Sequence, residues 1–353
     1  MHKFKSLQTF YWKEETFYIL DQRLLPHRVE YLPCKNHHDV IAAICTLAVR
    51  GAPAIGIAAA FAMALCGFQS LPECSSYERL KARLAEASQE LLASRPTAVN
   101  LAWALQRIEK WLSMNDHLTP REIAAGLLEE AEKIFKEDVE HNRMIGKNGS
   151  ALVPEGASIL THCNAGSLAT GGFGTALGVI RAAAQEGKNI HVYIDETRPL
   201  LQGARLSSFE MFYENIPATL IIDSCAAYLM KKGQVDLIVV GADRIAGNGD
   251  CANKIGTYAL AVLASYHKIP FYIAAPLSTI DLELSSGDKI IIEERSSEEI
   301  TSFAGNSVAP ENTSVFNPAF DVTPAGLITA LVTEKGIVYK PDQEKLYKLC
   351  TKV

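Results

Sequence analysis

Apolar and polar residues alternate near the start of the chain, over residues 16–20 and 28–32. A period of two is typical of short β-strands that bury one face. The pattern therefore predicts two or three short strands before residue 34, which would form a small antiparallel sheet.

From residue 38 to about residue 146 the apolar positions recur with the spacing of helices. The helical stretches lie near residues 41–49, 54–66, 76–93, 98–113 and 120–145. Pro72, Pro96 and Pro120 separate the later ones, because proline disfavours a helical conformation in the residue before it. Residues 1–147 are thus predicted to form a helical domain that carries the small sheet.

Beyond residue 148 short apolar runs alternate with helical segments, which is typical of α/β domains. The candidate strands are residues 158–162, 190–194, 218–222, 236–241 and 270–274. The candidate helices are residues 174–187, 203–214, 224–232 and 254–268. Residues 148–353 are therefore predicted to form a Rossmann-like domain with a mainly parallel sheet and a ligand site beyond the carboxyl ends of its strands.

Composition places the chain among ordinary globular proteins. Its 353 residues are too many for one ordinary core, which agrees with two domains. Hydrophobic residues make up 48% and charged residues 21%, so neither disorder nor a fibrous structure is indicated. The net charge is −6 and the basic residues are scattered, which argues against a nucleic-acid partner.

The apolar stretches do not indicate a membrane segment. The longest ones, around residues 41–66 and 237–240, are interrupted by Arg50 or are too short to cross a bilayer. The first residues also lack the pattern of a signal peptide. We therefore expect a cytoplasmic protein with no membrane partner.

The eight cysteines include no CxxC pair, so reduced thiols are expected. Only Cys163 has a context that indicates chemistry, because Thr161-His162-Cys163-Asn164-Ala165-Gly166 directly follows a predicted strand. A helix N-terminus nearby would lower the pKa of this thiol, whereas a closed apolar pocket would raise it. The alternative is a buried thiol that only fills space.

Asp243 follows the hydrophobic run at residues 236–241. A carboxyl partly removed from water there can hold or donate a proton near neutral pH. Asn253 and Lys254 are predicted to begin a helix, so that an amide, an ammonium and helix amides would converge on a phosphate or on sugar hydroxyls. The alternatives are an N-cap or a surface salt bridge for Asp243 and a solvated helix residue for Lys254.

Other segments provide candidate anion sites. Arg50-Gly51-Ala52-Pro53 leads into an apolar helix, and an arginine beside free helix amides can hold a phosphate. Arg95 offers a second cation before another helix, although each arginine could equally be a solvated surface group. The glycines at 171–174 could bring amides close to an oxyanion or simply form a turn. The GxGxxG order is absent, so no dinucleotide cofactor is expected.

No group of His, Cys, Asp or Glu has the sequence spacing of metal ligands, so no metal is expected. His162 beside Cys163 is the only exception. Adjacent residues on a strand point to opposite faces, so these two should not share one ion.

Taken together, the motifs resemble the methylthioribose-1-phosphate isomerase family over nearly the whole chain. The resemblance rests on residues 50–56, 94–97, 161–166, 196–199 with 202–206, 241–257 and 317–324. It implies an aldose–ketose isomerase that converts 5-methylthioribose 1-phosphate to 5-methylthioribulose 1-phosphate in methionine salvage. It also implies a helical domain with a small sheet joined to a Rossmann-like domain, and a homodimer.

The resemblance assigns roles to individual residues. Cys163 and Asp243 match the catalytic pair of that family. The residues that match its substrate-binding positions are Arg50, Gly51, Ala52, Arg95, Gln202, Asn253 and Lys254.

The substrate leaves two reaction schemes open. Its C1 carries the phosphate, so the sugar cannot open to a free aldehyde and a simple enediol route is closed. In one scheme Asp243 protonates the ring oxygen and Cys163 removes the C2 proton, which gives a phosphoenolate. In the other a hydride moves from C2 to C1, and the two residues transfer only oxygen-bound protons.

Two other functions share parts of the pattern. Ribose-1,5-bisphosphate isomerases also keep the catalytic pair, but residues 241–250 look like the methylthioribose enzymes. Regulatory subunits of translation initiation factor 2B share the fold and are not catalytic. They lack the cysteine and the aspartate, so the presence of Cys163 and Asp243 favours an enzyme.

Overall fold

The computed structural model describes residues 7–95 and 98–351. It begins with an antiparallel sheet of β1 (Phe10–Lys13), β2 (Thr16–Leu20) and β3 (Tyr31–Cys34), as the alternating pattern predicted. Phe17 on β2 is fully buried and stacks on Phe61, with ring centroids 4.4 Å apart. The sheet therefore shares its apolar face with the helical core.

Five helices follow, and they lie close to the predicted ranges. They are α1 (His37–Cys45), α2 (Ala52–Ser70), α3 (Tyr77–Ser94), α4 (Val99–Met114) and α5 (Pro120–Ser150). Capping boxes explain two of the starts, because Asn36 and Asp39 cap α1 while Thr119 and Glu122 cap α5. Each box satisfies backbone N–H groups that have no acceptor inside the helix.

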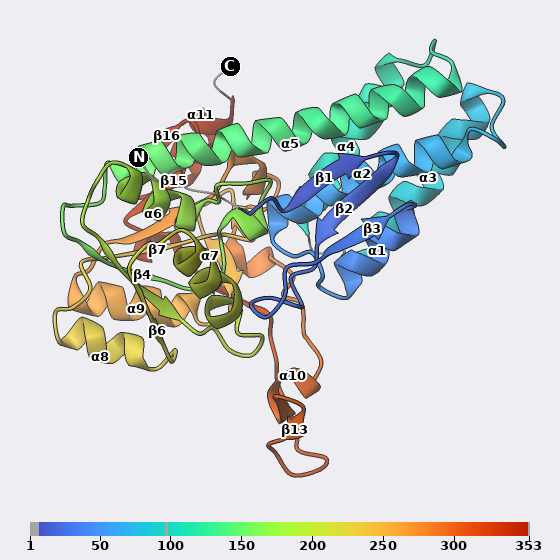
Figure 1. Cartoon of the computed structure of the whole chain (residues 1–353). Coiled ribbons are helices and arrows are strands. Elements are labelled where there is room, and N and C mark those ends of the chain that lie inside the picture. Colours follow the sequence, from blue (N-terminus) through green and yellow to red (C-terminus); the bar gives the residue numbers. More distant parts are fainter. Residues whose placement is uncertain (1–6, 96–97, 352–353) are drawn as a thin grey trace.

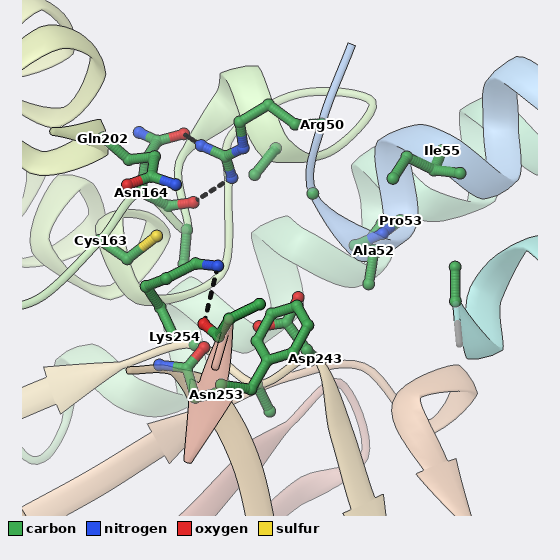
Figure 2. A pocket seen from close by; sticks show the side chains of 18 of the residues that line it. Arg50, Ala52, Pro53, Ile55, Cys163, Asn164, Gln202, Asp243, Asn253 and Lys254 are labelled. Carbon is green, nitrogen blue, oxygen red and sulfur yellow. Dashed lines mark hydrogen bonds between the residues drawn. The ribbon is translucent and has the colours of Figure 1, made fainter. Parts of the chain in front are cut away.

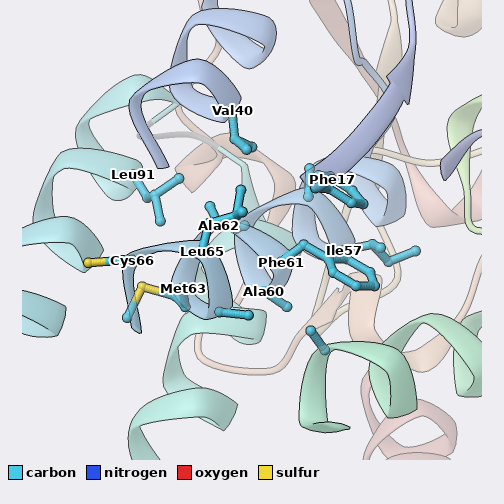
Figure 3. Packing of buried hydrophobic residues seen from close by; sticks show 14 of the residues in the cluster. Phe17, Val40, Ile57, Ala60, Phe61, Ala62, Met63, Leu65, Cys66 and Leu91 are labelled. Carbon is cyan, nitrogen blue, oxygen red and sulfur yellow. The ribbon is translucent and has the colours of Figure 1, made fainter. Parts of the chain in front are cut away.

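Helix α2 forms the centre of the helical domain (Figure 3). Its residues Ile57, Phe61 and Leu65 share one core cluster with side chains of β2, α1 and α3. By length and hydropathy alone this helix could cross a membrane. This was not apparent from the sequence, because the apolar stretch considered there starts at residue 41 and so includes Arg50, whereas the helix begins at Ala52. In the structure 83% of the most apolar stretch of this helix is buried inside the protein, as in the core helix of a soluble protein.

Helix α5 links the two parts of the molecule (Figure 1). Its C-terminal end packs against α6 (Ala176–Gln185) and β15 (Ala330–Thr333). The contact with α6 is close, because a Cβ atom on Gly149 would lie 2.3 Å from the side chain of Val179. The domain boundary expected between residues 147 and 148 thus lies within a continuous helix.

The second part contains a seven-stranded sheet in the order β16-β15-β10-β7-β4-β5-β6. Besides β15, its strands are β4 (Ser158–Thr161), β5 (His191–Asp195), β6 (Ala218–Ile221), β7 (Leu237–Val240), β10 (Phe271–Ala274) and β16 (Gly336–Tyr339). Only β16 pairs antiparallel, which confirms an α/β fold with a mainly parallel sheet. The strands β15 and β16 extend the sheet beyond the five strands that were predicted.

Helices cover both faces of this sheet. Residues of α5 and α6 share a core cluster with one set of strand side chains, and residues of α8, α9 and α11 share another cluster with the alternate set. The bounds of the remaining helices are α7 (Ser208–Tyr213), α8 (Cys225–Lys231), α9 (Thr257–His267) and α11 (Gln343–Thr351). A short segment with α10 (Glu298–Thr301), β12 (Ser302–Phe303) and β13 (Asn306–Ser307) projects from the body (Figure 1).

A further sheet, which the sequence pattern did not predict, has the order β11-β8-β9-β14. Its strands are β8 (Arg244–Ala246), β9 (Cys251–Lys254), β11 (Ile280–Asp281) and β14 (Phe320–Thr323). The prediction that Asn253 and Lys254 begin a helix was therefore wrong, because α9 begins only at Thr257. The two residues pair with β14, a partner that is remote in sequence, and such pairing overrides local helical preference.

Candidate active site

A cavity of about 360 Å³ lies where the helical domain meets the carboxyl ends of β4 and β7 (Figure 2). It is lined by every residue expected at the site, namely Arg50, Gly51, Ala52, Arg95, Cys163, Gln202, Asp243, Asn253 and Lys254. They come from the start of α2, the end of α3, the ends of two parallel strands, strand β9 and the turn before α7. Segments that are remote in sequence thus meet around one space.

Cys163 follows β4 and is held by its backbone. Its N–H donates to Thr197 Oγ1 at 2.8 Å, and its carbonyl accepts from Ser207 Oγ at 2.6 Å. Its φ of 62° lies in the left-handed region, which bends the chain sharply after the strand. Burial raises the pKa of the thiol, although the positive charges of Arg50 and Lys254 oppose this effect. The sequence left open whether the pKa of this thiol is lowered or raised, and the structure supports a raised pKa.

Asp243 lies between β7 and β8, and its side chain lines the cavity. Its backbone N–H donates to the carbonyl of Ala252 at 2.9 Å, which fixes its position against β9. Burial raises the pKa of its carboxyl, while Lys254, Arg50 and Arg95 act in the opposite direction. Asp243 does not begin a helix, so the N-cap alternative is excluded. A carboxyl that keeps its proton above the usual range suits a general acid.

Arg50 reaches across from the helical domain to the second domain. Its Nη1 donates to Asn164 Oδ1 at 2.8 Å and its Nη2 to the Asn164 carbonyl at 2.6 Å. Gly51 has a φ of 97°, and a Cβ atom there would lie 2.6 Å from the backbone of Ala169. Only glycine fits at this position without strain. Gly51 is the N-cap residue of α2 and has no side chain to cap the helix, so the first amides of the helix remain available to an oxyanion.

Lys254 lies opposite Arg50 and close to both catalytic candidates. Its Nζ donates to the carbonyl of Ala319 at 2.9 Å and lies 4.2 Å from the ring centroid of Phe320. Burial lowers the pKa of this ammonium, whereas Cys163 and Asp243 raise it. Both of these contacts are neutral, so the charge of Lys254 is available to a bound anion.

Asn253 and Gln202 complete the polar lining. The Asn253 amide donates to Thr257 Oγ1 at 3.0 Å, which ties β9 to the start of α9. Gln202 is buried, and its Oε1 has no hydrogen-bond partner among the described residues. A buried acceptor without a partner is a candidate contact for a substrate hydroxyl.

Arg95 has an acidic partner that the sequence did not reveal. Its Nη2 lies 3.0 Å from Glu293 Oε2, and Glu293 also pairs with Arg295 at 2.8 Å. Burial tends to raise the pKa of Glu293, but Arg295 and Arg95 outweigh it and the pKa is lowered. Pro96 and Thr97, which belong to the same motif, lie outside the described residues.

Arg205 is a second residue that the sequence analysis did not assign. It lines the cavity, and its guanidinium donates to the backbone carbonyls of Gln22 and Leu200 at 2.7 and 3.4 Å. Arg205 stands within the motif at residues 202–206, and this was the sequence signal that could have identified it.

Both ring nitrogens of His162 contact hydrogen-bond acceptors, and neither of these belongs to Cys163. Its Nδ1 lies 3.0 Å from Asp195 Oδ2 and its Nε2 lies 2.9 Å from the carbonyl of Ile255. Burial lowers the pKa of the imidazole, but the bond to Asp195 outweighs it and the pKa is raised, which favours the charged form. Because His162 and Cys163 follow β4 and both line the cavity, the expectation of opposite faces does not apply.

Asp223 lies near this pair, and His162, Asp195 and Asp223 place their ligand atoms within 4.8 Å of one another. The carboxylate of Asp223 accepts from the N–H groups of Thr197 and Arg198 at 2.7 and 2.8 Å. These contacts connect the histidine and the two carboxylates to the backbone at Ile255, Thr197 and Arg198.

The glycine-rich segment at residues 171–174 does not line the cavity. Gly171 donates its N–H to Asp138 Oδ2 at 2.6 Å, and a Cβ atom on Gly174 would lie 2.5 Å from the backbone of Gly166. The turn interpretation of these glycines therefore holds, and they are not oxyanion donors in this cavity.

Comparison with known proteins agrees with this geometry. The model of the Initiation factor 2 subunit family matches residues 48–340. A methylthioribose-1-phosphate isomerase from Desulforamulus reducens is 55% identical over 96% of this chain and 97% of its own length. The family match therefore spans every cavity-lining residue from Arg50 to Phe320.

Two solved structures are similar over almost the whole chain. The crystal structure of 5-methylthioribose 1-phosphate isomerase from Pyrococcus horikoshii has a TM-score of 0.90 and 47% identity, and covers 97% of this chain and 95% of its own. A structure from A. fulgidus, named translation initiation factor eIF-2B, subunit delta, has a TM-score of 0.85 and 43% identity over 97% of this chain and 100% of its own. The chain therefore belongs to the Initiation factor 2 subunit family, in the group that includes the methylthioribose-1-phosphate isomerases.

Proposed function

We propose that the protein is an aldose–ketose isomerase that converts 5-methylthioribose 1-phosphate to 5-methylthioribulose 1-phosphate in methionine salvage. The observation that carries the proposal is the convergence of Cys163 and Asp243 with Arg50 and Lys254 around one cavity. The identity of 55% to a methylthioribose-1-phosphate isomerase supports the same substrate.

The cavity suits the chemistry that this substrate requires. Ring opening needs a proton on the ring oxygen, and Asp243 is placed to donate it because burial raises the pKa of its carboxyl. The second catalytic group, Cys163, then accepts a proton from carbon in the phosphoenolate scheme or from oxygen in the hydride scheme. This step requires its thiolate form, which burial disfavours and the charges of Arg50 and Lys254 favour. In both schemes the proton returns within the cycle, so the reaction consumes no acid or base.

The phosphate is proposed to lie between Arg50, Lys254 and the first amides of α2. Within the part of the chain that the structure describes, neither cation forms an ion pair with a carboxylate. The amides of Gly51 and Ala52 belong to an uncapped helix start, where an anion is favoured by the helix dipole. Gln202, Asn253 and the Arg95–Glu293 pair remain to bind the hydroxyls of the sugar.

A non-catalytic role, as in subunits of translation initiation factor 2B, is the second candidate. The A. fulgidus structure named for that factor is 43% identical to this chain, so the fold alone does not separate the two functions. A buried thiol and a buried carboxyl that share one cavity with uncompensated cations favour the enzyme.

Incubation of the purified protein with 5-methylthioribose 1-phosphate is expected to produce the ketose 1-phosphate, observed by NMR. Turnover should be equal before and after treatment with a chelator, because the proposed proton transfers use only Asp243 and Cys163. No turnover would refute the proposed function. Loss of turnover on chelation, restored by one divalent ion, would refute the metal-free mechanism.

We also propose that the protein is a homodimer. Exposed apolar side chains lie on and beside β6: Leu220 is on the strand, Ile222 directly follows it, and Phe212 is on α7, which contacts β6, and is 83% exposed. Strand β6 is the last strand of its sheet and has unpaired backbone groups. An exposed apolar area beside an open sheet edge is typical of an interface.

Sedimentation equilibrium is expected to give about twice the chain mass of 38.5 kDa. Leu220→Asp should shift the protein toward the monomer, because it places a charge at the edge of the proposed interface. Tyr347→Asp, at an exposed position on α11 outside this area, serves as the control and should leave the mass unchanged. A wild-type mass equal to one chain would contradict the proposal.

A further inference from the structure

Asn164 stands between the phosphate-binding candidate Arg50 and a buried ion pair. It is 3% exposed, and its side-chain oxygen and its carbonyl both accept from the guanidinium of Arg50. On its other side the amide Nδ2 donates to Glu210 Oε1 at 2.8 Å and to Ser207 Oγ at 3.1 Å. Each polar atom of the side chain thus has a partner, which fixes its orientation.

Glu210 is anchored on the far side of Asn164. This carboxylate on α7 is 1% exposed, and it also accepts from the N–H and the hydroxyl of Ser167 at 2.8 Å each. Arg181 on α6, itself 2% exposed, pairs with Glu210 and with Glu214. The carboxylate lies so close to the loop that a Cβ atom on Gly166 would be 2.3 Å from it.

The contacts that run from Arg181 through Glu210 and Asn164 to Arg50 leave Arg50 with its positive charge. Arg181 compensates Glu210, and Asn164 is neutral, so the carboxylate fixes the position of Arg50 without touching it. Arg95 shows the contrasting arrangement, because its guanidinium contacts the carboxylate of Glu293 directly. A guanidinium held by neutral acceptors keeps its full attraction for a phosphate.

We propose that Asn164 is a positioning residue, a neutral link that holds Arg50 in place for the substrate phosphate while it keeps the charge of Glu210 away from it. The inference rests on the proposed function, since it assumes that Arg50 binds the phosphate. It extends that function to residues outside the substrate contacts, because Glu210 and Arg181 act through Asn164. The link also crosses the domain boundary, so it couples the position of Arg50 to the loop that carries Cys163.

The critical test is Asn164→Asp, measured by calorimetric titration with inorganic phosphate. At pH 8 the introduced carboxylate would contact Arg50 directly and neutralise it, so the Kd for phosphate should rise on the order of ten-fold or more. Asn164→Ala removes the link without adding a charge and should weaken binding less. In turnover of 5-methylthioribose 1-phosphate, KM should rise more in Asn164→Asp than in Asn164→Ala. The change in kcat should be smaller than the change in KM in both variants.

Lowering the pH should rescue Asn164→Asp and not Asn164→Ala. A protonated carboxyl reproduces the asparagine, because its O–H can donate to Glu210 while its carbonyl accepts from Arg50. The charged groups that face this position are Arg50 and Glu210, with Arg181 behind Glu210 and the Cys163 thiol beside it in the chain. Because phosphate itself titrates, the Kd of the variant is divided by that of the wild type at each pH between 8 and 5.5. This ratio should fall toward one.

Asn142→Asp is the matched control. Asn142 is also fully buried, and its amide also donates to a carboxylate, Asp138, but it does not line the cavity. Any general effect of a buried second carboxyl should therefore appear in this variant as a change in stability, with the phosphate Kd unchanged. A phosphate Kd for Asn164→Asp equal to that of Asn164→Ala at every pH would overturn the inference.

A second measurement keeps the inference testable if Asn164→Asp does not fold. Asn164→Ala should weaken phosphate binding in the wild-type background and have no further effect when Arg50→Gln is already present, because the link then has nothing to position. Equal effects in both backgrounds would count against it. Phosphate binding is measured without turnover, so an inactive wild-type protein would refute the proposed function and leave this inference to be decided by the titrations.

Discussion

Asp243→Asn and Cys163→Ser are each expected to lower kcat by about a hundred- to ten-thousand-fold, the usual cost of removing a positioned acid or base. Asparagine cannot donate a proton to the ring oxygen, and a serine hydroxyl is far less acidic than a thiol. Both changes nearly preserve side-chain volume, so the fold should survive. Steady-state kinetics with 5-methylthioribose 1-phosphate provides the measurement.

Two matched controls separate chemistry from packing. Cys251→Ser changes another fully buried thiol, which lies on β9 but does not line the cavity. Asp236→Asn changes a carboxylate at the opposite end of β7, where it accepts a hydrogen bond from the N–H of Ser158. Both controls should keep kcat within a few-fold of the wild type. Near-normal turnover by Asp243→Asn or Cys163→Ser would remove that residue from the catalytic pair.

Much of the fold could be predicted because it follows from local periodicity. The alternation at residues 16–20, the helical spacing of α2 to α5 and the buried runs of β4 and β7 are each contained within a few residues. Strand β9 could not be predicted in this way. Its segment Cys251–Lys254 has no apolar alternation and becomes a strand because β8 and β14 pair with it on both sides.

The same distinction holds for the site. The residues placed around the cavity from the sequence stand in motifs that were recognised by family resemblance, and periodicity alone would not have joined Arg50 to Cys163. Glu293 and Glu210 were missed because the contacts that connect them to the site, with Arg95 and Asn164 respectively, are with residues remote in sequence. Neither acid has a neighbour in sequence that distinguishes it from a solvated surface residue.

The charges of the cavity also determine which sugar phosphate can bind. Among the described residues, Arg50, Lys254 and Arg205 contact only neutral acceptors, which is enough for one phosphate. Arg95 and Arg295 also line the cavity, but both pair with Glu293. A second phosphate would therefore meet a carboxylate where it needs a free cation.

The wall near Glu293 suits a neutral, apolar substituent. Ile290 and Ile291, which are close to Glu293 in the chain, line the cavity, and burial of a methylthio group gains roughly 0.8 kcal/mol for each methylene-sized part. A phosphate buried at the same place without a partner would lose a much larger hydration energy. We therefore expect kcat/KM for 5-methylthioribose 1-phosphate to exceed that for ribose 1,5-bisphosphate by at least about a hundred-fold.

The two substrates are compared with one enzyme preparation, and Glu293→Gln tests the cause. Loss of this charge would release Arg95, while Arg295 keeps Glu299 as its partner, so the bisphosphate should gain relative to the methylthio substrate, even if both turnover rates fall. Glu299→Gln is the control, because Glu299 also pairs with Arg295 but does not line the cavity. This control should leave the ratio unchanged. A wild-type ratio near one, or a ratio that favours the bisphosphate, would contradict the single-phosphate site and assign the protein to the bisphosphate isomerases.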